Sequence, residues 1–215
     1  MNTLIITGGH IDLPFAKKQV DTGVWDCVIS ADSGLNFCRK AGIWPDVILG
    51  DFDSADPDVL QFFQKKCPER ILTFPAQKDE TDTELAILHA IRAGADRITL
   101  LGATGSRLDH VLGNLQLLLP AMEAGAACII LDEHNRIRMI RDTLTIRREE
   151  QFGRYVSLLP FTPQVEGLTL TGFVYETENF TLTSGKARGV SNEIRDEEAR
   201  IVLKSGILIV IESRD

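Results

Sequence analysis

The feature that most constrains the fold is an alternation of short apolar runs with helical patterns in the first two-thirds of the chain. The runs are rich in Ile and Val and cover residues 4–7, 27–31, 47–49, 71–74, 98–101 and 128–131. Runs of this kind are typical of strands that are buried on both faces of a parallel sheet. The alternation therefore predicts an α/β fold, a doubly wound and mainly parallel sheet with helices on both faces.

Capping residues mark the helices between these runs. Asp56 is a predicted N-cap because Pro57 follows it in the first helical position. Thr81 and Glu84 have the spacing of a capping box. One helix predicted in this way ends at Gly42. The other three cover residues 57–67, 81–93 and 108–124.

The pattern changes near residue 140. Short strand-like runs follow one another at close spacing, separated by Gly and Pro, at residues 144–146, 155–159, 168–171, 179–182, 199–203 and 207–211. This pattern predicts a small all-β sandwich, with a domain boundary between residues 1–142 and 143–215. A module of about 70 residues buries little apolar area, so we expect it to pack on the first domain or on a second subunit.

Composition narrows the class of protein. The chain has 23 Lys and Arg against 31 Asp and Glu, a formal net charge of −8. This balance argues against binding to nucleic acid or to a membrane surface, since both are polyanionic. No apolar run reaches the ~18 residues of a membrane span, and the first residues lack a basic leader. We expect a cytoplasmic protein with reduced cysteines, because no C-x-x-C pair occurs among Cys27, Cys38, Cys67 and Cys128.

Acidic residues follow four of the predicted strands. They are Asp32, the pair Asp51 and Asp53, the cluster at residues 79–82, and Asp109. The carboxyl ends of the strands are where doubly wound folds bind ligands. Two unit charges 4 Å apart repel each other by about 4 kcal/mol at an effective dielectric of about 20. A rim of carboxylates therefore predicts a divalent cation, and ligands that are all oxygen favour Mg²⁺.

A glycine-rich turn at residues 102–107 opens the helix that follows the fifth strand. Backbone N–H groups in such a turn, together with the helix N-terminus, suit a phosphate group. Arg107 could add a bidentate contact to the same phosphate. Acidic metal ligands beside a phosphate cradle point to chemistry on a magnesium nucleotide. The Walker A pattern is absent from the sequence, which argues against a P-loop kinase.

Each motif also has a purely structural interpretation. Asp32 and the acidic cluster at residues 79–82 could serve only as N-caps. His110 lies in the first turn of an apolar helix, where a histidine more often has a structural role than a ligand-binding one. Asn114 lies one helical turn further on. The Gly8-Gly9 pair could serve only to shape a turn. Asp51 and Asp53 are harder to explain structurally, because an i,i+2 pair in an extended segment places both carboxylates on one side.

Five of these segments resemble the motifs of thiamine pyrophosphokinases, and they occur in the family's order. They are Ala31-Asp32-Ser33-Gly34, the run Pro45-Asp46-Val47-Ile48-Leu49-Gly50-Asp51-Phe52-Asp53-Ser54, Lys78-Asp79-Glu80-Thr81-Asp82, the run from Gly102 to His110, and Gly189-Val190-Ser191-Asn192-Glu193. The resemblance implies an ATP-dependent thiamine diphosphotransferase. It also implies a nucleotide-binding catalytic α/β domain, a thiamine-binding β-sandwich, and a homodimer with shared active sites.

The resemblance also implies roles for individual residues. Mg²⁺ would bind Asp51, Asp53 and Asp82, which together with Asp109 form the predicted catalytic set. The residues predicted to surround ATP are Asp32, Lys78, Thr81, Thr104, Gly105, Arg107, His110 and Asn114. Ser191 and Asn192 would line the thiamine pocket. Animal and yeast members carry a C-terminal Trp that contacts thiamine, but residues 206–210 of this chain contain none.

Three questions stay open at this point. Either Asp82 or Asp109 could accept the proton of the thiamine hydroxyl. The same acidic rim would also serve a magnesium-dependent kinase or nucleotidyltransferase that acts on another small alcohol. A third possibility is a sensor that binds thiamine or a nucleotide without turnover.

Overall fold

The computed structural model describes residues 1–75, 77 and 79–215. The chain forms two compact units, Met1–Glu133 and His134–Asp215. The division falls earlier than the expected boundary at residue 142. The reason is that β7 (Asn135–Ile140) pairs with β14 (Leu208–Ser213), a strand of the second unit.

The first unit contains a parallel sheet. In the order β6-β5-β1-β2-β3-β4, its strands are β6 (Ala127–Leu131), β5 (Arg97–Leu101), β1 (Asn2–Ile6), β2 (Cys27–Ala31), β3 (Val47–Gly50) and β4 (Ile71–Thr73). Neighbouring strands pair in parallel throughout this order. Ile5, Ile29 and Leu100 are fully buried, as expected for strands that are covered on both faces. The predicted doubly wound fold is confirmed.

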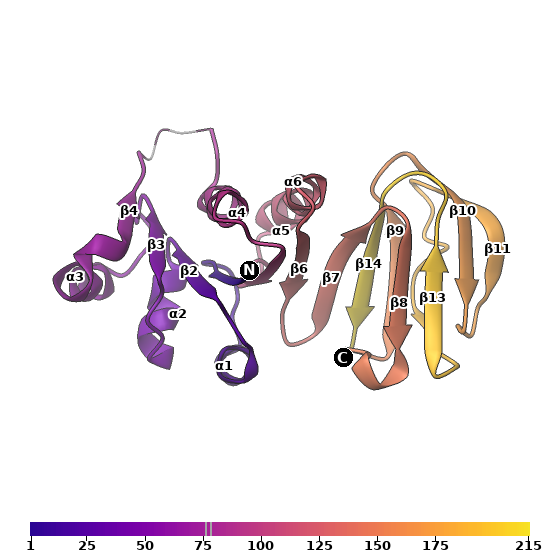
Figure 1. Cartoon of the computed structure of the whole chain (residues 1–215), viewed down its shortest axis with the longest axis horizontal. Helices are drawn as coiled ribbons and strands as arrows, with labels where there is room; N and C mark the ends of the chain where they lie inside the picture. Colours follow the sequence, from indigo (N-terminus) through magenta and orange to yellow (C-terminus); the bar gives the residue numbers. More distant parts are fainter. Residues whose placement is uncertain (76, 78) are drawn as a thin grey trace. The chain divides into compact units, whose positions relative to one another are not determined.

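Helices lie on both faces of this sheet (Figure 1). They are α1 (Leu13–Thr22), α2 (Gly34–Ala41), α3 (Pro57–Lys66), α4 (Asp82–Arg92), α5 (Leu108–Gln116) and α6 (Leu118–Glu123), with a short 3-10 helix at Pro68–Arg70. Helices α1 and α2 lie on one face, and α4, α5 and α6 lie on the other. Asp56 and Thr81 are N-caps and Gly42 is a C-cap, as predicted.

One helix was missed from the sequence, and two others were merged into one. Helix α1 was not predicted, although Asp12 caps it by accepting a hydrogen bond from the Phe15 N–H at 2.8 Å. The predicted helix over residues 108–124 is two helices, α5 and α6. Pro120 accounts for the break, since it has no N–H to donate to the carbonyl of Gln116.

The second unit is an antiparallel sandwich, as predicted. One layer contains the strands β12-β9-β14-β7 in this order, and the other is a four-stranded sheet in the order β11-β10-β13-β8. The remaining bounds are β8 (Thr143–Arg147), β9 (Tyr155–Pro160), β10 (Gln164–Thr171), β11 (Thr177–Thr183), β12 (Asn192–Glu193) and β13 (Glu198–Val202), with a 3-10 helix at Arg148–Glu150. Val156, Phe173, Ile201 and Val210 are fully buried in its core.

A buried ion cluster links β7 to β14. Glu212 is fully buried on β14, opposite Arg136 in the register of the two strands. Its carboxylate accepts hydrogen bonds from Arg136 Nε at 2.8 Å, from Arg138 Nη2 at 2.6 Å and from the Phe152 N–H at 3.1 Å. These contacts satisfy the carboxylate, which would be costly to bury alone.

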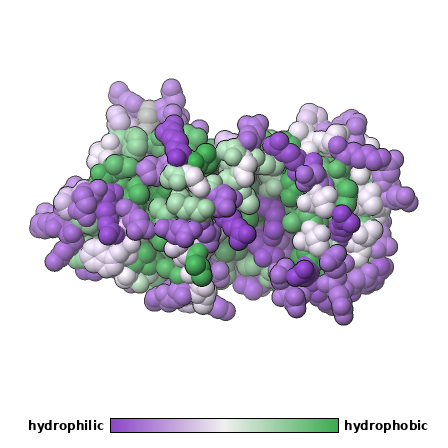
Figure 2. Space-filling model, in the orientation of Figure 1, coloured by the Kyte–Doolittle hydropathy of each residue, from purple (hydrophilic) through white to green (hydrophobic). Residues whose placement is uncertain are grey.

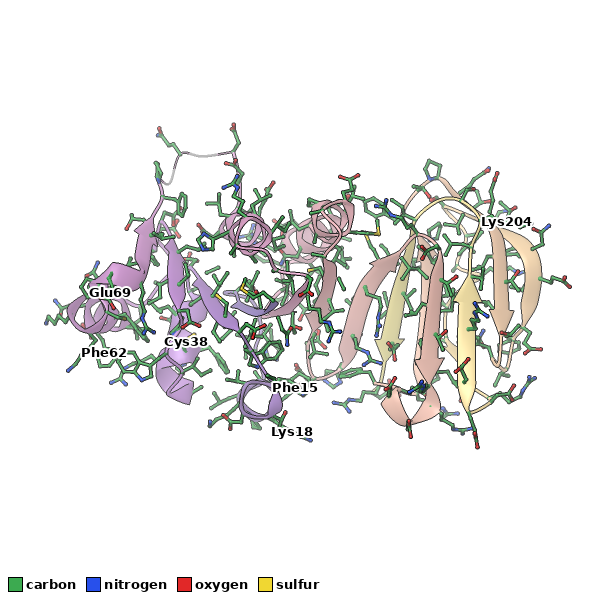
Figure 3. All side chains as sticks on the ribbon, viewed as in Figure 1. Phe15, Lys18, Cys38, Phe62, Glu69 and Lys204 are labelled. Atoms are coloured by element: carbon green, nitrogen blue, oxygen red, sulfur yellow. The ribbon has the colours of Figure 1, made fainter. Side chains whose placement is uncertain are left out.

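All four cysteines are free, and Cys38, labelled in Figure 3, lies inside the first unit. Burial raises the pKa of Cys38 and of Cys128 to about 12, so both thiols are protonated. Figure 2 shows hydrophilic residues over much of the drawn face, with hydrophobic residues between them. Among the described residues, no helix is long and apolar enough to cross a membrane.

Candidate functional site

The loops that follow β2 and β3 approach each other closely. Asp32 comes directly after β2 with a φ of 46°, and Phe52 follows β3 with a φ of 63°. A positive φ is uncommon for residues other than Gly and costs about 1–2 kcal/mol, so the surrounding packing must hold these two turns. A Cβ on Gly50 would lie 3.2 Å from Asp32 Cα, tighter than ordinary contact. Glycine at position 50 therefore permits the two acidic loops to meet.

Three carboxylates gather where these loops meet. Asp32, Asp51 and Asp53 each offer one oxygen, and these oxygens all lie within 4.8 Å of one another. Asp51 Oδ1 also accepts a hydrogen bond from the Asp53 N–H at 3.1 Å. The structure thus brings together Asp51 and Asp53, which the resemblance assigns to the metal, and Asp32, which it assigns to the nucleotide. We call these three residues the carboxylate trio.

Asp32 has one carboxylate oxygen that is buried and unpaired within the trio. Its Oδ2 accepts a hydrogen bond from Ser33 Oγ at 3.2 Å, whereas its Oδ1 is buried and without a hydrogen-bond partner. Burial is the main cause that raises the pKa of Asp32. Hydrogen bonds from Ser33 oppose this shift, and the charges of Asp82 and Asp53 add to it. An orphaned carboxylate oxygen among like charges fits a hard cation, and oxygen ligands suit Mg²⁺.

Asp82, which the resemblance assigns to the metal, stands outside the trio. It is the first residue of α4, and its charge acts on Asp32 as described above. The hydroxyl of Thr81, predicted as a nucleotide contact, caps α4 by accepting from the Glu84 N–H at 3.2 Å. Lys78 lies outside the described residues.

A second group of loops surrounds the carboxyl ends of β1 and β5. Thr7 Oγ1 donates to the Gly102 carbonyl at 2.6 Å, and the Gly9 N–H donates to the same carbonyl at 2.8 Å. A Cβ on Gly9 would lie 2.2 Å from the Gly102 carbonyl oxygen, so a larger residue does not fit. Gly9 thus does more than shape a turn, because it allows the two loops to join.

The predicted phosphate-binding residues lie on or beside the loop after β5. Thr104 accepts a hydrogen bond at its carbonyl from the His10 N–H at 2.7 Å. Gly105 follows it with a φ of 156°. Asn114 Nδ2 donates to the Ala103 carbonyl at 2.8 Å, so this side chain supports the loop from α5. His110 is exposed on α5.

Arg107 and Asp109 form an exposed ion pair at the start of α5. Arg107 Nη2 lies 2.6 Å from Asp109 Oδ2. The hydrogen bond from Arg107 is the main cause that lowers the pKa of Asp109, and the same bond raises the pKa of Arg107. Because both side chains are exposed, the pair is weak and can open for a stronger anion.

In the second unit, Ser191 and Asn192 make hydrogen bonds that hold the local backbone. Ser191 has a φ of 58°, and its N–H donates to Ser157 Oγ at 3.0 Å. The buried Asn192 side chain accepts from the Tyr175 N–H at 3.0 Å and donates to the Tyr175 carbonyl at 2.8 Å. Its oxygen also accepts from the Glu193 N–H at 2.9 Å. The Asn192 side chain therefore holds the backbone of Tyr175, whereas Ser191 is exposed.

Sequence reasoning missed His10 as a candidate. Its backbone joins the loop after β5, and its ring Nε2 lies 3.0 Å from Glu133 Oε1. The available signal was the Gly8-Gly9 turn directly before it, at the end of a buried strand.

These features place the chain in the class of doubly wound α/β proteins with ligand-binding groups at the carboxyl ends of the strands. Residues 24–130 match the family model of the thiamin pyrophosphokinase catalytic domain. Residues 142–208 match the model of the thiamin pyrophosphokinase vitamin B1 binding domain.

Individual relatives agree with the family models. Thiamine pyrophosphokinase of Bacillus subtilis (strain 168) is 35% identical over 187 residues, which cover 87% of each chain. A crystal structure of thiamine pyrophosphokinase from Bacillus subtilis has a TM-score of 0.89 at 33% identity, with 100% of both chains covered. Yeast thiamin pyrophosphokinase, at 18% identity, shares the fold with a TM-score of 0.80 over 99% of this chain and 86% of that one. The chain belongs to the thiamine pyrophosphokinase family.

Proposed function

We propose that this chain transfers the pyrophosphoryl group of ATP to the hydroxyl of thiamine, giving thiamine pyrophosphate and AMP. The observation that carries the proposal is the carboxylate trio with its orphaned Asp32 oxygen, in a chain 35% identical to a thiamine pyrophosphokinase. The trio would supply oxygen ligands for Mg²⁺. The glycine-rich loop after β5, which leads into the N-terminus of α5, would supply backbone N–H groups for phosphate.

In this reaction the thiamine hydroxyl oxygen attacks the β-phosphorus of ATP. The bond from the β-phosphorus to the oxygen bridging to the α-phosphorus breaks, and AMP leaves. Mg²⁺ held by Asp32, Asp51 and Asp53, with Asp82 nearby, would supply the charge neutralisation that phosphoryl transfer needs. Arg107 would leave Asp109 to hold a phosphate with its planar fork.

The proton of the hydroxyl needs an acceptor. In the ion pair the hydrogen bond from Arg107 lowers the pKa of Asp109, and this effect ends when Arg107 turns to a phosphate. Asp82 and Asp109 therefore both stay candidates for the proton acceptor. The other residues predicted to surround ATP would shape the nucleotide site around Asp82 and Asp109. They are Thr81, Thr104, Gly105, His110 and Asn114.

The sandwich would contribute the thiamine site. Ser191 offers an exposed hydroxyl, and Asn192 would act through the backbone that it holds. We further propose a cytoplasmic homodimer with shared active sites. Mixing an Asp51→Asn chain with an Asn192→Ala chain should then restore activity that each lacks alone. Mixed dimers of confirmed mass without recovered activity would contradict shared sites.

The reaction is tested by incubating the protein with ATP, Mg²⁺ and thiamine and separating the products by chromatography. Equal amounts of AMP and thiamine pyrophosphate are expected. Release of ADP or of free pyrophosphate would instead support another kinase or a nucleotidyltransferase. Binding of both substrates without any product would support a sensor.

A further inference from the structure

His10 lies where three loops of the first unit meet. Its backbone N–H donates to the Thr104 carbonyl at 2.7 Å, which links the loop after β1 to the loop after β5. Its ring Nε2 lies 3.0 Å from Oε1 of Glu133, which lies two residues beyond the end of β6. The strands β1, β5 and β6 are consecutive neighbours in the sheet. One residue thus connects the carboxyl ends of three adjacent strands.

This place is the topological switch point of the sheet. From β1 the chain proceeds outward through β2, β3 and β4, and then returns to place β5 on the other side of β1. Connections that leave in opposite directions open a crevice beside these strand ends, and open α/β sheets bind their ligands there. Here the loops on the two sides are built from Gly8, Gly9, Gly102 and Gly105. These glycines can offer a ligand only their backbone groups, since they have no side chains.

The His10 side chain lies beside these strand ends. It is 62% exposed, so a ligand can reach it. The carboxylate of Glu133 accepts from Nε2 and so fixes the orientation of the ring. That hydrogen bond leaves Nδ1, the second ring nitrogen, for another partner. An imidazolium carries an N–H on both nitrogens and can donate to two anions at once.

We infer that His10 is a nucleotide-contact residue, in which Nδ1 donates a hydrogen bond to a phosphate oxygen while Glu133 holds Nε2. The inference rests on the nucleotide part of the proposed function. The backbone of His10 also keeps the glycine-rich loop after β5 in position for the same phosphate group.

Two substitutions separate the roles of the ring nitrogens. The amide nitrogen of Gln can replace Nε2, and the amide nitrogen of Asn can replace Nδ1. We expect His10→Gln and His10→Ala to weaken ATP binding about 10- to 150-fold, the scale of one hydrogen bond to a charged group. His10→Asn should recover most of this loss. The KM for thiamine should not change in any of the three variants.

The probe is ATP with Mg²⁺, titrated into the full chain by calorimetry without thiamine and followed by steady-state kinetics. His89→Gln, in the last turn of α4, is the matched control and should bind ATP normally. The inference is wrong if His10→Gln binds ATP like the wild type. It is also wrong if the three variants lower the melting temperature and raise both KM values in parallel, since the ring would then only connect loops.

The wild-type titration separates this inference from the proposed reaction. A wild-type protein that binds ATP but forms no thiamine pyrophosphate would overturn the reaction, and the binding comparison would still decide the role of His10. A wild-type protein that does not bind ATP would overturn both.

Discussion

Replacing Asp32 with Asn should stabilise the protein when no divalent metal is present. Asn keeps the shape of the side chain and tolerates the positive φ at this position. It removes the repulsion of Asp32 against both Asp51 and Asp53, whose oxygens lie within 4.8 Å. In a water-like dielectric each such pair costs about 0.9 kcal/mol. The water-like value applies to the exposed Asp53 and is a lower limit for Asp51, which is half-buried.

Together the two repulsions amount to roughly 2 kcal/mol of unfolding free energy. For a domain of this size that corresponds to a rise in melting temperature of about 4 to 8 °C. The effect should depend on pH, because the pKa of Asp32 is raised in the folded protein. The folded state then binds the Asp32 proton more tightly than the unfolded state does. Wild-type stability therefore falls as pH rises through that raised pKa, and the Asn variant lacks this loss.

The assay is thermal unfolding in chelator and in excess Mg²⁺, followed by circular dichroism. A metal that binds the folded state at a concentration one hundred times its dissociation constant stabilises it by about 2.7 kcal/mol. Wild type should gain this stability on adding Mg²⁺, and Asp32→Asn should gain much less. Glu178→Gln, which removes one exposed negative charge from the second unit, is the control and should behave as wild type.

Two results would refute this reasoning. One is a lower melting temperature of Asp32→Asn in chelator, which would show that the carboxylate stabilises the fold. The other is an equal gain from Mg²⁺ in variant and wild type, which would show that Asp32 is not a metal ligand.

Further predictions concern the catalytic loops and the sandwich. Asp51→Asn and Asp53→Asn should each lower kcat about a hundredfold or more in steady-state assays, and near-normal magnesium-dependent turnover would contradict the metal site. Arg107→Lys keeps the charge but loses the planar guanidinium fork, so calorimetry should show weaker ATP binding. Unchanged ATP binding would mean that Arg107 serves only in its surface ion pair with Asp109. Glu212→Gln removes the fully buried carboxylate between two guanidinium groups, so urea unfolding should show a loss of roughly 3 to 5 kcal/mol in unfolding free energy. A change near zero would refute this prediction.

The sequence predicts the sheet of the first unit well because its strands are buried on both faces and therefore apolar along their whole length. Strand β7 was missed for the opposite reason. Its Arg136 and Arg138 interrupt the apolar pattern, and only Glu212, far along the chain, explains their presence there. Helix α1 was missed because a single residue, Ala16, is fully buried along it. Such an element has too little apolar pattern to detect.

The site shows the same division. Asp51 and Asp53 could be found from their spacing, since both follow one strand. The place of Asp32 beside them depends on how closely Gly50 lets two loops approach, which is a property of the folded backbone. The contact of His10 with Glu133 joins residues 123 positions apart. No local pattern in the sequence indicates a contact of that kind.

In the proposed reaction both terminal phosphates of ATP move together to thiamine. The decisive measurement uses ATP labelled at the β-phosphorus, incubated with Mg²⁺ and thiamine and analysed by product chromatography. The label should leave the nucleotide and appear in thiamine pyrophosphate, with unlabelled AMP as the other product. Label that stays in ADP, with thiamine monophosphate formed beside it, would overturn the proposed reaction.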